Sequence, residues 1–367
     1  MPAEQHARPE NKSSLPRYDW KRSYDWNYKH APEPAAFAEP DVPGKWDFCD
    51  LAVGSPLGIA AGPLLNGRWI LYYASLGFDV LTYKTVRSRV RASYPLPNLQ
   101  PVATTRVNGG EGPLPVSRVM RGSWAVSFGM PSKSPDVWRA DVEATRRALP
   151  KGKILSVSVV ATPEDDWTLD DIAEDFARCT KWAVENGADC IEANFSCPNV
   201  ASADGQLYHH PAAAQIVAER LRRAVGRKPL LIKIGHVTNE AAATDLSKAL
   251  DPHVDALVMV NCIAALVMNA RGEQLFNGEP RGLAGDAIRE AALDQVRLFA
   301  RVIRRHKLKL RLVGVGGIST AQHVREQLVA GSHAVQLATA AMLGPFRGLN
   351  IRAKLARPCE PSRLLGT

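Results

Sequence analysis

The sequence has no long hydrophobic run and no clustered cysteines. No stretch approaches the roughly 18 consecutive apolar residues of a membrane-spanning helix, and the first residues, MPAEQHARPENKSS, lack the apolar core of a signal peptide. The six cysteines include no Cys-x-x-Cys pair, which argues against a zinc ribbon or a self-contained iron–sulfur site. We therefore expect a cytoplasmic protein with no membrane contact and no metal site, in which any iron–sulfur cluster sits on another subunit.

The chain does have enough apolar residues for a large core. Of its 367 residues, 46% are hydrophobic and 23% are charged, which is the balance of an ordinary globular protein. The formal net charge of +9 would suit an anionic small molecule, a cofactor phosphate or nucleic acid. Because the Lys and Arg residues are spread along the chain, charge alone does not choose among these ligands.

Residues 1–45 are rich in proline and charge but also carry an aromatic near-repeat. It consists of Tyr18-Asp-Trp20 and Tyr24-Asp-Trp26, followed by Tyr28. Disordered segments usually lack aromatic residues, so we expect a flexible tip and then an arm whose rings dock on the barrel or on a second subunit. Stacking on nucleic acid is a less favoured alternative. The predicted division is an N-terminal extension over 1–45, a main domain over 46–357 and a C-terminal tail over 358–367.

From residue 58 onward, short β-prone runs alternate with amphipathic helical stretches, which is typical of parallel βα units. Two of the helical stretches are Thr168 to Asn186 and Ile288 to His306. Eight such units predict an α/β protein of the (β/α)8 TIM-barrel class. The eight predicted strands are Gly58 to Gly62, Val80 to Thr85, Ile154 to Ala161, Cys190 to Ser196, Leu230 to Gly235, Ala256 to Asn261, Arg311 to Gly317 and Ala334 to Ala340.

Two stretches interrupt this alternation, residues 86–152 and residues 262–287. Both follow the carboxyl end of a predicted strand, which is the face of a TIM barrel that carries the active site. The first stretch contains several Gly and Pro residues, as in Tyr94-Pro-Leu-Pro-Asn98 and Asn108-Gly-Gly-Glu-Gly112. We expect irregular loops or small hairpins over the barrel mouth.

The most informative segment is Glu192-Ala-Asn-Phe-Ser-Cys-Pro-Asn199, where a predicted strand ends in a cysteine flanked by asparagines. A free cysteine usually only packs, but amides on both sides of a thiol also suit a substrate held beside an acid or base. Lys84 ends the second predicted strand and Lys233 lies in the fifth. Because an unpaired buried charge is costly, the lysines indicate a ligand with negative charge, unless each pairs with a core carboxylate such as Glu192.

Small residues gather where a cofactor would approach the backbone closely. Ala60-Ala61-Gly62 ends the first predicted strand and leaves room for a planar ligand. Gly314-Val-Gly316-Gly317 ends the seventh strand, and Ala338-Thr339-Ala340 ends the eighth. In many TIM barrels these two places hold a phosphate through backbone N–H groups. The pattern predicts a phosphorylated ligand such as FMN.

Taken together and in order, these motifs resemble the dihydroorotate dehydrogenase family of FMN-dependent barrels, and also the flavin domain of dihydropyrimidine dehydrogenase. The resemblance covers about residues 46–350, and the cysteine at position 197 is similar to the soluble, cysteine-base type. Its anchors are Pro56-Leu-Gly-Ile-Ala-Ala-Gly62, Lys84-Thr85, Asn194-Phe-Ser-Cys-Pro-Asn199, Leu231-Ile-Lys233, Val260-Asn261, Gly282-Leu-Ala-Gly285, Gly314-Val-Gly-Gly-Ile318 and Gln336-Leu-Ala-Thr-Ala340.

The resemblance implies a role for each matching residue. Cys197 would be the acid/base, and Lys233 would neutralise the reduced flavin. The implied FMN-binding residues are Ala61, Gly62, Lys84, Thr85, Asn194, Lys233, Val260, Gly285, Gly316, Gly317, Ala338 and Thr339. The implied substrate-binding residues are Lys84, Ser127, Asn194, Asn199, Asn261 and Cys262.

The implied reaction, oxidation of dihydroorotate to orotate, suits these residue types. A proton leaves one carbon of a CH–CH bond while a hydride passes from its neighbour to the flavin. A thiol has an ordinary pKa of about 8.5, and nearby cations would lower it enough to serve as the base. Asparagine offers both a donor and an acceptor, which can match the alternating N–H and C=O groups of a pyrimidine ring.

The chain departs from the family pattern in one loop. The family's Asn-Ser-x-Gly-x-Pro-Asn appears here as Val126-Ser-Phe-Gly-Met-Pro-Ser132, so two asparagines are replaced. In dihydroorotate dehydrogenases the first of them contacts the substrate, and losing a buried hydrogen-bond partner costs about 1–3 kcal/mol. Cys262 also replaces a hydroxyl residue that is common in the family.

Other functions stay open at this point. One is a dehydrogenase or reductase of dihydrouracil-like or other cyclic amides, and another is a partner-dependent flavin subunit that passes electrons to an iron–sulfur protein. A third resembles tRNA dihydrouridine synthases, but the fifth strand continues as Lys233-Ile-Gly235-His236 without that family's arginine. We expect a homodimer with a small-molecule dihydropyrimidine substrate, an electron-transfer subunit as a further candidate partner, and no nucleic acid.

Overall fold

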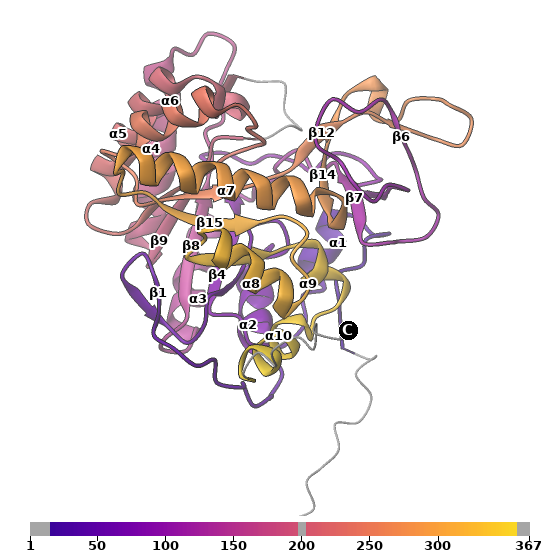
Figure 1. Cartoon of the computed structure of the whole chain (residues 1–367), viewed down its shortest axis with the longest axis horizontal. Helices are drawn as coiled ribbons and strands as arrows, with labels where there is room; N and C mark the ends of the chain where they lie inside the picture. Colours follow the sequence, from indigo (N-terminus) through magenta and orange to yellow (C-terminus); the bar gives the residue numbers. More distant parts are fainter. Residues whose placement is uncertain (1–14, 197–202, 358–367) are drawn as a thin grey trace, which may run out of the picture.

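The computed structural model describes residues 15–196 and 203–357, and in this part of the chain eight parallel strands close into a barrel (Figure 1). Around the barrel the strands follow the order β10-β11-β15-β16-β3-β4-β8-β9. The predicted TIM barrel is confirmed, with each strand inside or within a residue of its predicted run. The strands are β3 Leu57–Ile59, β4 Val80–Val86, β8 Ile154–Val159, β9 Cys190–Asn194, β10 Leu230–Lys233, β11 Ala256–Met259, β15 Arg311–Val315 and β16 Ala334–Leu337.

Helices cover the outside of the barrel, so nearly every strand residue is buried, as expected for a parallel sheet. The helix predicted over Thr168 to Asn186 is α4, which a capping box starts: the Thr168 hydroxyl accepts from the Asp171 N–H, and the Asp171 carboxylate accepts from the Thr168 N–H. The helices are α2 Gly67–Ala74, α3 Pro135–Ala148, α4 Leu169–Glu185, α5 Pro211–Val225, α6 Glu240–Leu250, α7 Arg289–His306, α8 Ala321–Ala330, α9 Thr339–Leu343 and α10 Arg347–Leu355, with short 3-10 turns Ala203–His209, Phe276–Gly278 and Asp286–Ile288.

The two insertions pair with each other rather than forming separate loops. Strands from both make an antiparallel sheet in the order β12-β14-β7-β5, with Leu283 of β14 opposite Ala125 of β7. The first insertion also contains helix α3, which was not predicted. No local sequence pattern indicates which distant segment a strand pairs with, so this sheet could not be predicted. The strands are β5 Leu99–Pro101, β6 Leu114–Pro115, β7 Ser123–Val126, β12 Ile263–Ala265, β13 Val267–Met268 and β14 Arg281–Gly285, and β13 pairs with β6.

The N-terminal arm packs against the barrel. It contains the short helix α1 Tyr24–Lys29, which Ser23 caps by accepting a hydrogen bond from the Trp26 N–H. The side chains of Tyr18 and Tyr24 are buried. The sequence predicted that the rings dock either on the barrel or on a second subunit, and in the structure they dock on the barrel. None of the described helices is long and apolar enough to cross a membrane.

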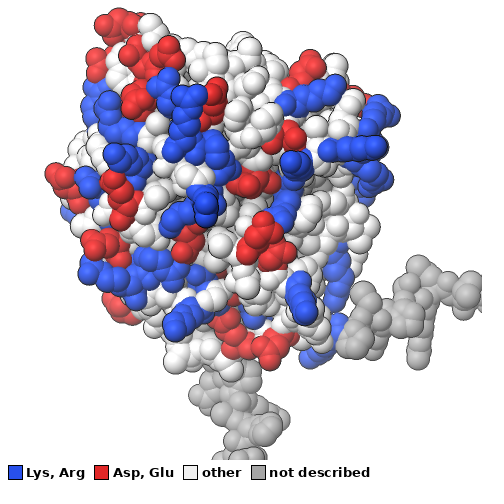
Figure 2. Space-filling model, turned by 90° about the vertical axis from the view of Figure 1, so that its left-hand side faces the viewer, with Lys and Arg blue, Asp and Glu red and all other residues white. Residues whose placement is uncertain are grey.

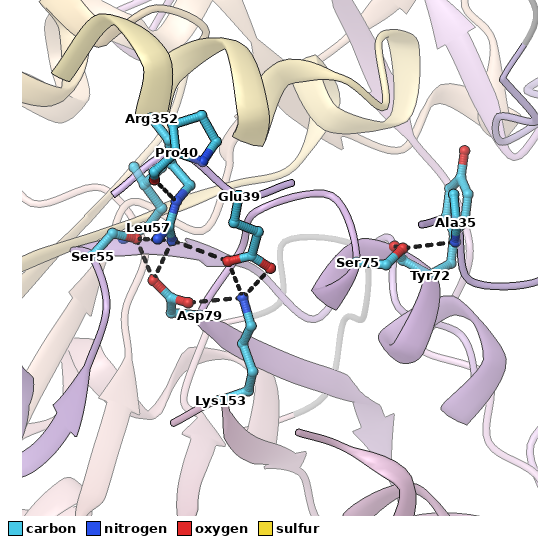
Figure 3. A network of polar contacts seen from close by, with 10 residues as sticks. All are labelled: Ala35, Glu39, Pro40, Ser55, Leu57, Tyr72, Ser75, Asp79, Lys153 and Arg352. Atoms are coloured by element: carbon cyan, nitrogen blue, oxygen red, sulfur yellow. Dashed lines mark hydrogen bonds and ion pairs between the residues drawn. The ribbon is translucent and has the colours of Figure 1, made fainter. Parts of the chain in front are cut away.

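Hydrophobic and ionic contacts close the amino end of the barrel. The hairpin of β1 Trp46–Phe48 and β2 Leu51–Val53 places Phe48 and Cys49 against the starts of the barrel strands. Beside it lies a buried ionic network (Figure 3). Lys153 Nζ lies 2.6 Å from Glu39 of the arm and 2.9 Å from Asp79, while Arg352 of α10 lies 2.8 Å from Asp79.

The charges on the surface are mixed. On the face shown in Figure 2, Lys and Arg side chains alternate with Asp and Glu side chains over the helices. The structure has many exposed ion pairs, such as Arg220 with Glu174 at 2.8 Å. The net positive charge is therefore not gathered into one patch on this face.

Candidate active site

A cleft of about 850 Å³, counted with the solvent at its mouth, lies at the carboxyl ends of the barrel strands. This is the face on which TIM barrels carry their active sites. Every barrel strand sends a residue of its own or of the turn that follows it into the cleft, and for β11 this residue is Asn261. The polar and small lining residues are Ala60, Ala61, Gly62, Lys84, Thr85, Ser158, Glu192, Asn194, Lys233, Asn261, Ala338 and Thr339.

A second cavity of about 350 Å³ adjoins the cleft and shares Ala284, Val315 and Thr339 with it. Its wall includes Gly285, Gly316 and Gly317, all with positive φ. A Cβ on Gly317 would lie 2.4 Å from the Cβ of Arg289, and one on Gly285 would lie 2.0 Å from the Gly122 carbonyl oxygen. Glycine is required here both by the backbone conformation and by the close packing.

A buried polar cluster forms the floor of the cleft. Lys233 Nζ lies 3.6 Å from the Glu192 carboxylate. The sequence left open whether each lysine pairs with a core carboxylate, and for Lys233 the structure shows that it does. Gln336 Nε2 donates to Glu192 at 3.0 Å and to Thr82 Oγ1 at 3.1 Å. Within the described residues, Gln336 Oε1 has no hydrogen-bond partner although the side chain is buried. Gln336 lines the adjoining cavity, so its Oε1 is a hydrogen-bond acceptor beside that cavity which the described residues leave unused.

The cleft has an excess of positive charge. Among its described lining residues, two lysines accompany a single carboxylate, Glu192. The second lysine, Lys84, lies with its Nζ 5.0 Å from the centre of the Phe128 ring. In the described ranges, no group of three or more His, Cys, Asp or Glu side chains could hold a metal ion. The electrostatics thus favour an anionic ligand.

Two amide side chains form one wall. Asn261 Nδ2 donates to Asn194 Oδ1 at 3.3 Å and to the carbonyl oxygen of Ser196. Asn194 Oδ1 also accepts from the Ser196 N–H at 3.1 Å. These bonds tie the end of β9 to the turn after β11, directly before the segment that begins at position 197. The wall presents two amides at fixed positions, which suits a ligand with both donors and acceptors.

The family model of dihydroorotate dehydrogenase matches residues 45–358 of the chain. The chain belongs to the dihydroorotate dehydrogenase family. The dihydroorotate dehydrogenase of Dictyostelium discoideum is 30% identical over 357 residues, which cover 90% of this chain and 95% of that protein.

Two further relatives of the dihydroorotate dehydrogenase family differ in how much of the chain they match. The catalytic subunit of dihydroorotate dehydrogenase B (NAD(+)) from Citrifermentans bemidjiense is 33% identical over 190 residues, or 51% of this chain and 59% of that protein. A crystal structure of DHODH from Eimeria tenella, in complex with ferulenol, aligns with a TM-score of 0.72 at 18% identity and covers 90% of this chain and 88% of that one. The structural match shows the shared fold.

The structure brings together most of the residues that the family resemblance implied. Ten line the cleft and a further three line only the adjoining cavity, whereas Val260 and Ser127 line neither. Val260 is fully buried and donates its N–H to the Val315 carbonyl, and the Ser127 hydroxyl accepts from Arg281 Nε at 3.0 Å. Cys197 and Asn199 lie outside the described residues. The cleft residues are Ala61, Gly62, Lys84, Thr85, Asn194, Lys233, Asn261, Cys262, Ala338 and Thr339, and those of the cavity are Gly285, Gly316 and Gly317.

Sequence reasoning missed the apolar wall of the cleft. Trp124, Val126 and Phe128 alternate along and just beyond β7, and all three line the cleft, whereas Ser127 does not. A period of two is the signal of a strand with one face on a cavity, but the family motif was interpreted as a loop. Of the two departures from that motif, Val126 faces the cleft, while Ser132 accepts from the Arg87 N–H away from it. The apolar wall is completed by Leu99, Met130, Ala284 and Met342.

Proposed function

We propose that this chain is an FMN-dependent oxidoreductase that converts dihydroorotate to orotate. One observation carries the proposal: a single cleft at the barrel mouth joins two lysines and two asparagine amides to a glycine-lined cavity. Membership of the dihydroorotate dehydrogenase family supports the same reaction. The coarser statement, an oxidoreductase of CH–CH groups in this family, does not depend on the identity of the substrate.

FMN fits the described residues. The glycine-lined cavity has room and backbone N–H groups for a phosphate, and the space beside Gly62 is open, with no atom within 4 Å of the position a Cβ would take. Lys233 offers a cation at the floor, and Gln336 Oε1 is a buried acceptor without a partner among the described residues. When bound, the flavin would accept a hydride from the substrate. Lys233 would then face the added negative charge.

For the substrate, we propose that Asn194 and Asn261 bind the amide edges of the ring and that Lys84 contributes a positive charge. Cys197, which lies outside the described residues, is the proposed base. Its thiolate would take the proton from one carbon of the CH–CH bond as the hydride leaves the neighbouring carbon. The Asn261 bonds to Asn194 and Ser196 would hold the chain directly before Cys197, which orients the base.

Val126 favours a second candidate. Its side chain lines the cleft where the family motif has an asparagine, and its neighbours Leu99 and Phe128 are apolar as well. A wall with fewer hydrogen-bond donors discriminates less strongly for a polar substituent on the ring. The alternative is therefore a dihydropyrimidine without the carboxylate, such as dihydrouracil, or another cyclic amide.

The deciding experiment is an anaerobic titration of the purified yellow protein, followed by flavin absorbance. Bleaching by dihydroorotate, with weak or no bleaching by dihydrouracil, is the expected result. Bleaching by dihydrouracil alone would select the second candidate. An oxidised spectrum with both compounds would reject both substrates.

The assembly and location complete the proposal. A relative named as a catalytic subunit supports an electron-transfer partner for this chain, while the homodimer, the cytoplasmic location and the three-part division at residues 45 and 357 stay predictions. Light scattering of the purified chain, alone and after co-purification from its own cells, would test the homodimer and the partner. Activity of the single chain with fumarate, quinone, NAD or a dye would identify the electron acceptor.

A further inference from the structure

The arm segment, defined here as residues 16–30, touches the back of the apolar wall of the cleft. The rings of Tyr18 and Tyr24 meet the Phe128 ring edge to face, with centroids 6.3 Å and 6.1 Å away. Phe128 is buried by these rings and lines the cleft, and Lys84 Nζ lies over its ring. The arm segment therefore contacts Lys84, a proposed substrate-binding residue, through a single intervening side chain, that of Phe128.

A second route from the arm segment to the cleft passes through Asn98. The Tyr24 N–H donates to Asn98 Oδ1 at 3.0 Å. Asn98 Nδ2 donates to the backbone carbonyl oxygens of Tyr94 at 2.9 Å and Ser127 at 3.0 Å. The backbone carbonyl of Asn98 accepts from the Ser127 N–H at 2.7 Å. Ser127 lies between the two cleft residues Val126 and Phe128. One fully buried amide therefore joins the arm backbone to this part of the wall.

The arm segment is anchored to a rigid part of the barrel at its other side. Trp69 Nε1 of α2 donates to the Asn27 carbonyl at 3.0 Å, and the Tyr72 hydroxyl donates to the Pro16 carbonyl at 2.6 Å. Asn66, the N-cap of α2, donates to the Tyr28 carbonyl at 2.8 Å. The arm segment therefore connects a barrel helix to the cleft wall through well-defined contacts at both ends.

We propose that Tyr18 and Tyr24 are positioning residues for the reaction, which hold Phe128, and through it Lys84, at the substrate side of the cleft. The inference rests on the proposed function and adds the arm segment to its active site. The Tyr18 hydroxyl has no hydrogen-bond partner among the described residues, so this ring acts through its shape and its contacts. Displacing the wall by a fraction of an ångström misplaces the substrate relative to the base and the flavin.

The test compares two full-length, FMN-loaded variants. In Y18L/Y24L both rings are lost, and we expect weaker binding of dihydroorotate and an anaerobic flavin reduction slower by about 10- to 100-fold. FMN affinity should fall by less than the reduction rate, because the arm contacts reach only Lys84 among the implied FMN-binding residues and none of Gly285, Gly316 and Gly317 in the adjoining cavity. The matched control is F37L, in the N-terminal extension but outside the arm segment, whose ring is 41% exposed and packs on Phe346 instead. It should reduce flavin at the normal rate.

A readout without substrate separates this inference from the proposed function. Amide hydrogen exchange at Ser127, whose N–H is bonded to Asn98, should be faster in Y18L/Y24L than in F37L and the unaltered chain. If the unaltered chain is not bleached by dihydroorotate, the proposed function fails while the exchange comparison still decides whether the arm holds the wall. Normal reduction kinetics or unchanged Ser127 exchange in a folded Y18L/Y24L protein would overturn the inference. Should the double variant not fold, Y24L alone is measured in the same way.

Discussion

The two ends of the barrel both bury charged side chains, but they balance those charges differently. At the amino end, Lys153 and Arg352 meet Glu39 and Asp79, two cations with two carboxylates, all within 3.6 Å of a partner. At the carboxyl end, the described cleft lining contains Lys84, Lys233 and one carboxylate, Glu192, which lies 3.6 Å from Lys233. Balanced charges need no ligand, whereas an excess of one sign is stabilised when a ligand of the other sign binds.

Packing shows the same contrast. The amino end is filled by Phe48 and Cys49 of the β1–β2 hairpin, and burial raises the pKa of the Cys49 thiol to about 12. Such a thiol stays protonated and inert at neutral pH. The carboxyl end keeps an open cleft and a cavity walled by glycines. Changes at the amino end should therefore affect stability, and changes at the carboxyl end should affect binding and redox chemistry.

The largest effect is expected at the carboxyl end, in Cys197→Ser. Serine's hydroxyl is a much weaker base near neutral pH, so flavin reduction should slow by about 10² to 10⁴-fold, while FMN remains bound and the unfolding temperature stays close to normal. Stopped-flow absorbance with dihydroorotate measures the rate. Normal turnover in this variant would remove Cys197 from the mechanism.

At the amino end, Asp79→Asn should cost about 3–5 kcal/mol of unfolding free energy, because Lys153 and Arg352 keep their charges in a buried place with only Glu39 to balance them. Chemical denaturation measures the loss. The matched control is Glu174→Gln, an exposed carboxylate paired with Arg220, which should change stability by less than about 1 kcal/mol. Equal effects in both variants would break the contrast between buried and exposed pairs.

Val126→Asn tests the apolar wall of the cleft. A restored amide should strengthen orotate binding by up to about 1–3 kcal/mol if it finds a buried partner on the ligand. Titration of the flavin spectrum with orotate measures the affinity, and Ser132→Asn, at the motif position that does not line the cleft, serves as the comparison. Unchanged or weaker binding in Val126→Asn would indicate that the cleft is organised around a different ligand.

Glu192→Gln tests the charge excess directly. Glu192, 3.6 Å away, partly neutralises the charge of Lys233. Without this carboxylate, Lys233 would stabilise the more negative reduced flavin more strongly, so the midpoint potential of the flavin should rise. A tenfold change in the equilibrium constant between oxidised and reduced flavin corresponds to about 30 mV for a two-electron couple. Spectroelectrochemistry measures the potential, with Glu174→Gln again as the control for a lost carboxylate. A potential that is unchanged or lower would mean that Glu192 does not moderate Lys233.

The smallest effect concerns pH. Burial, together with the neighbouring Arg311, lowers the pKa of His333 below its ordinary value of 6.5, and its Nδ1 accepts a hydrogen bond from the Leu312 N–H. The neutral ring is favoured in the folded state, so its contribution to stability is present above pH 6.5 and is lost as the pH falls through the lower folded value. Melting temperatures between pH 8 and pH 5 should show a slightly smaller loss in His333→Asn than in the unaltered chain. An identical pH profile would contradict the assignment.

Local patterns were enough to predict the barrel. Each buried strand is a continuous β-prone run, and the two helices whose ranges were predicted, α4 and α7, were found with their ends within a residue. Motif order along the chain also located Lys84, Asn194, Asn261 and the glycines that line the cleft and its adjoining cavity. These features are readable because they depend on neighbours within a few positions, or on a family pattern that is written in the sequence.

Long-range contacts account for what was missed. The sheet joining β7 to β14 pairs segments from two insertions, and its register decides that Val126 and Phe128 face the cleft while Ser127 faces Arg281. The pairing of Lys233 with Glu192 requires the register of β9 beside β10. The arm could have docked on a partner, and only its fit to α2 and Phe128 places it on the barrel. Composition and periodicity determine which elements form, whereas the direction of each side chain depends on which distant strand lies beside it.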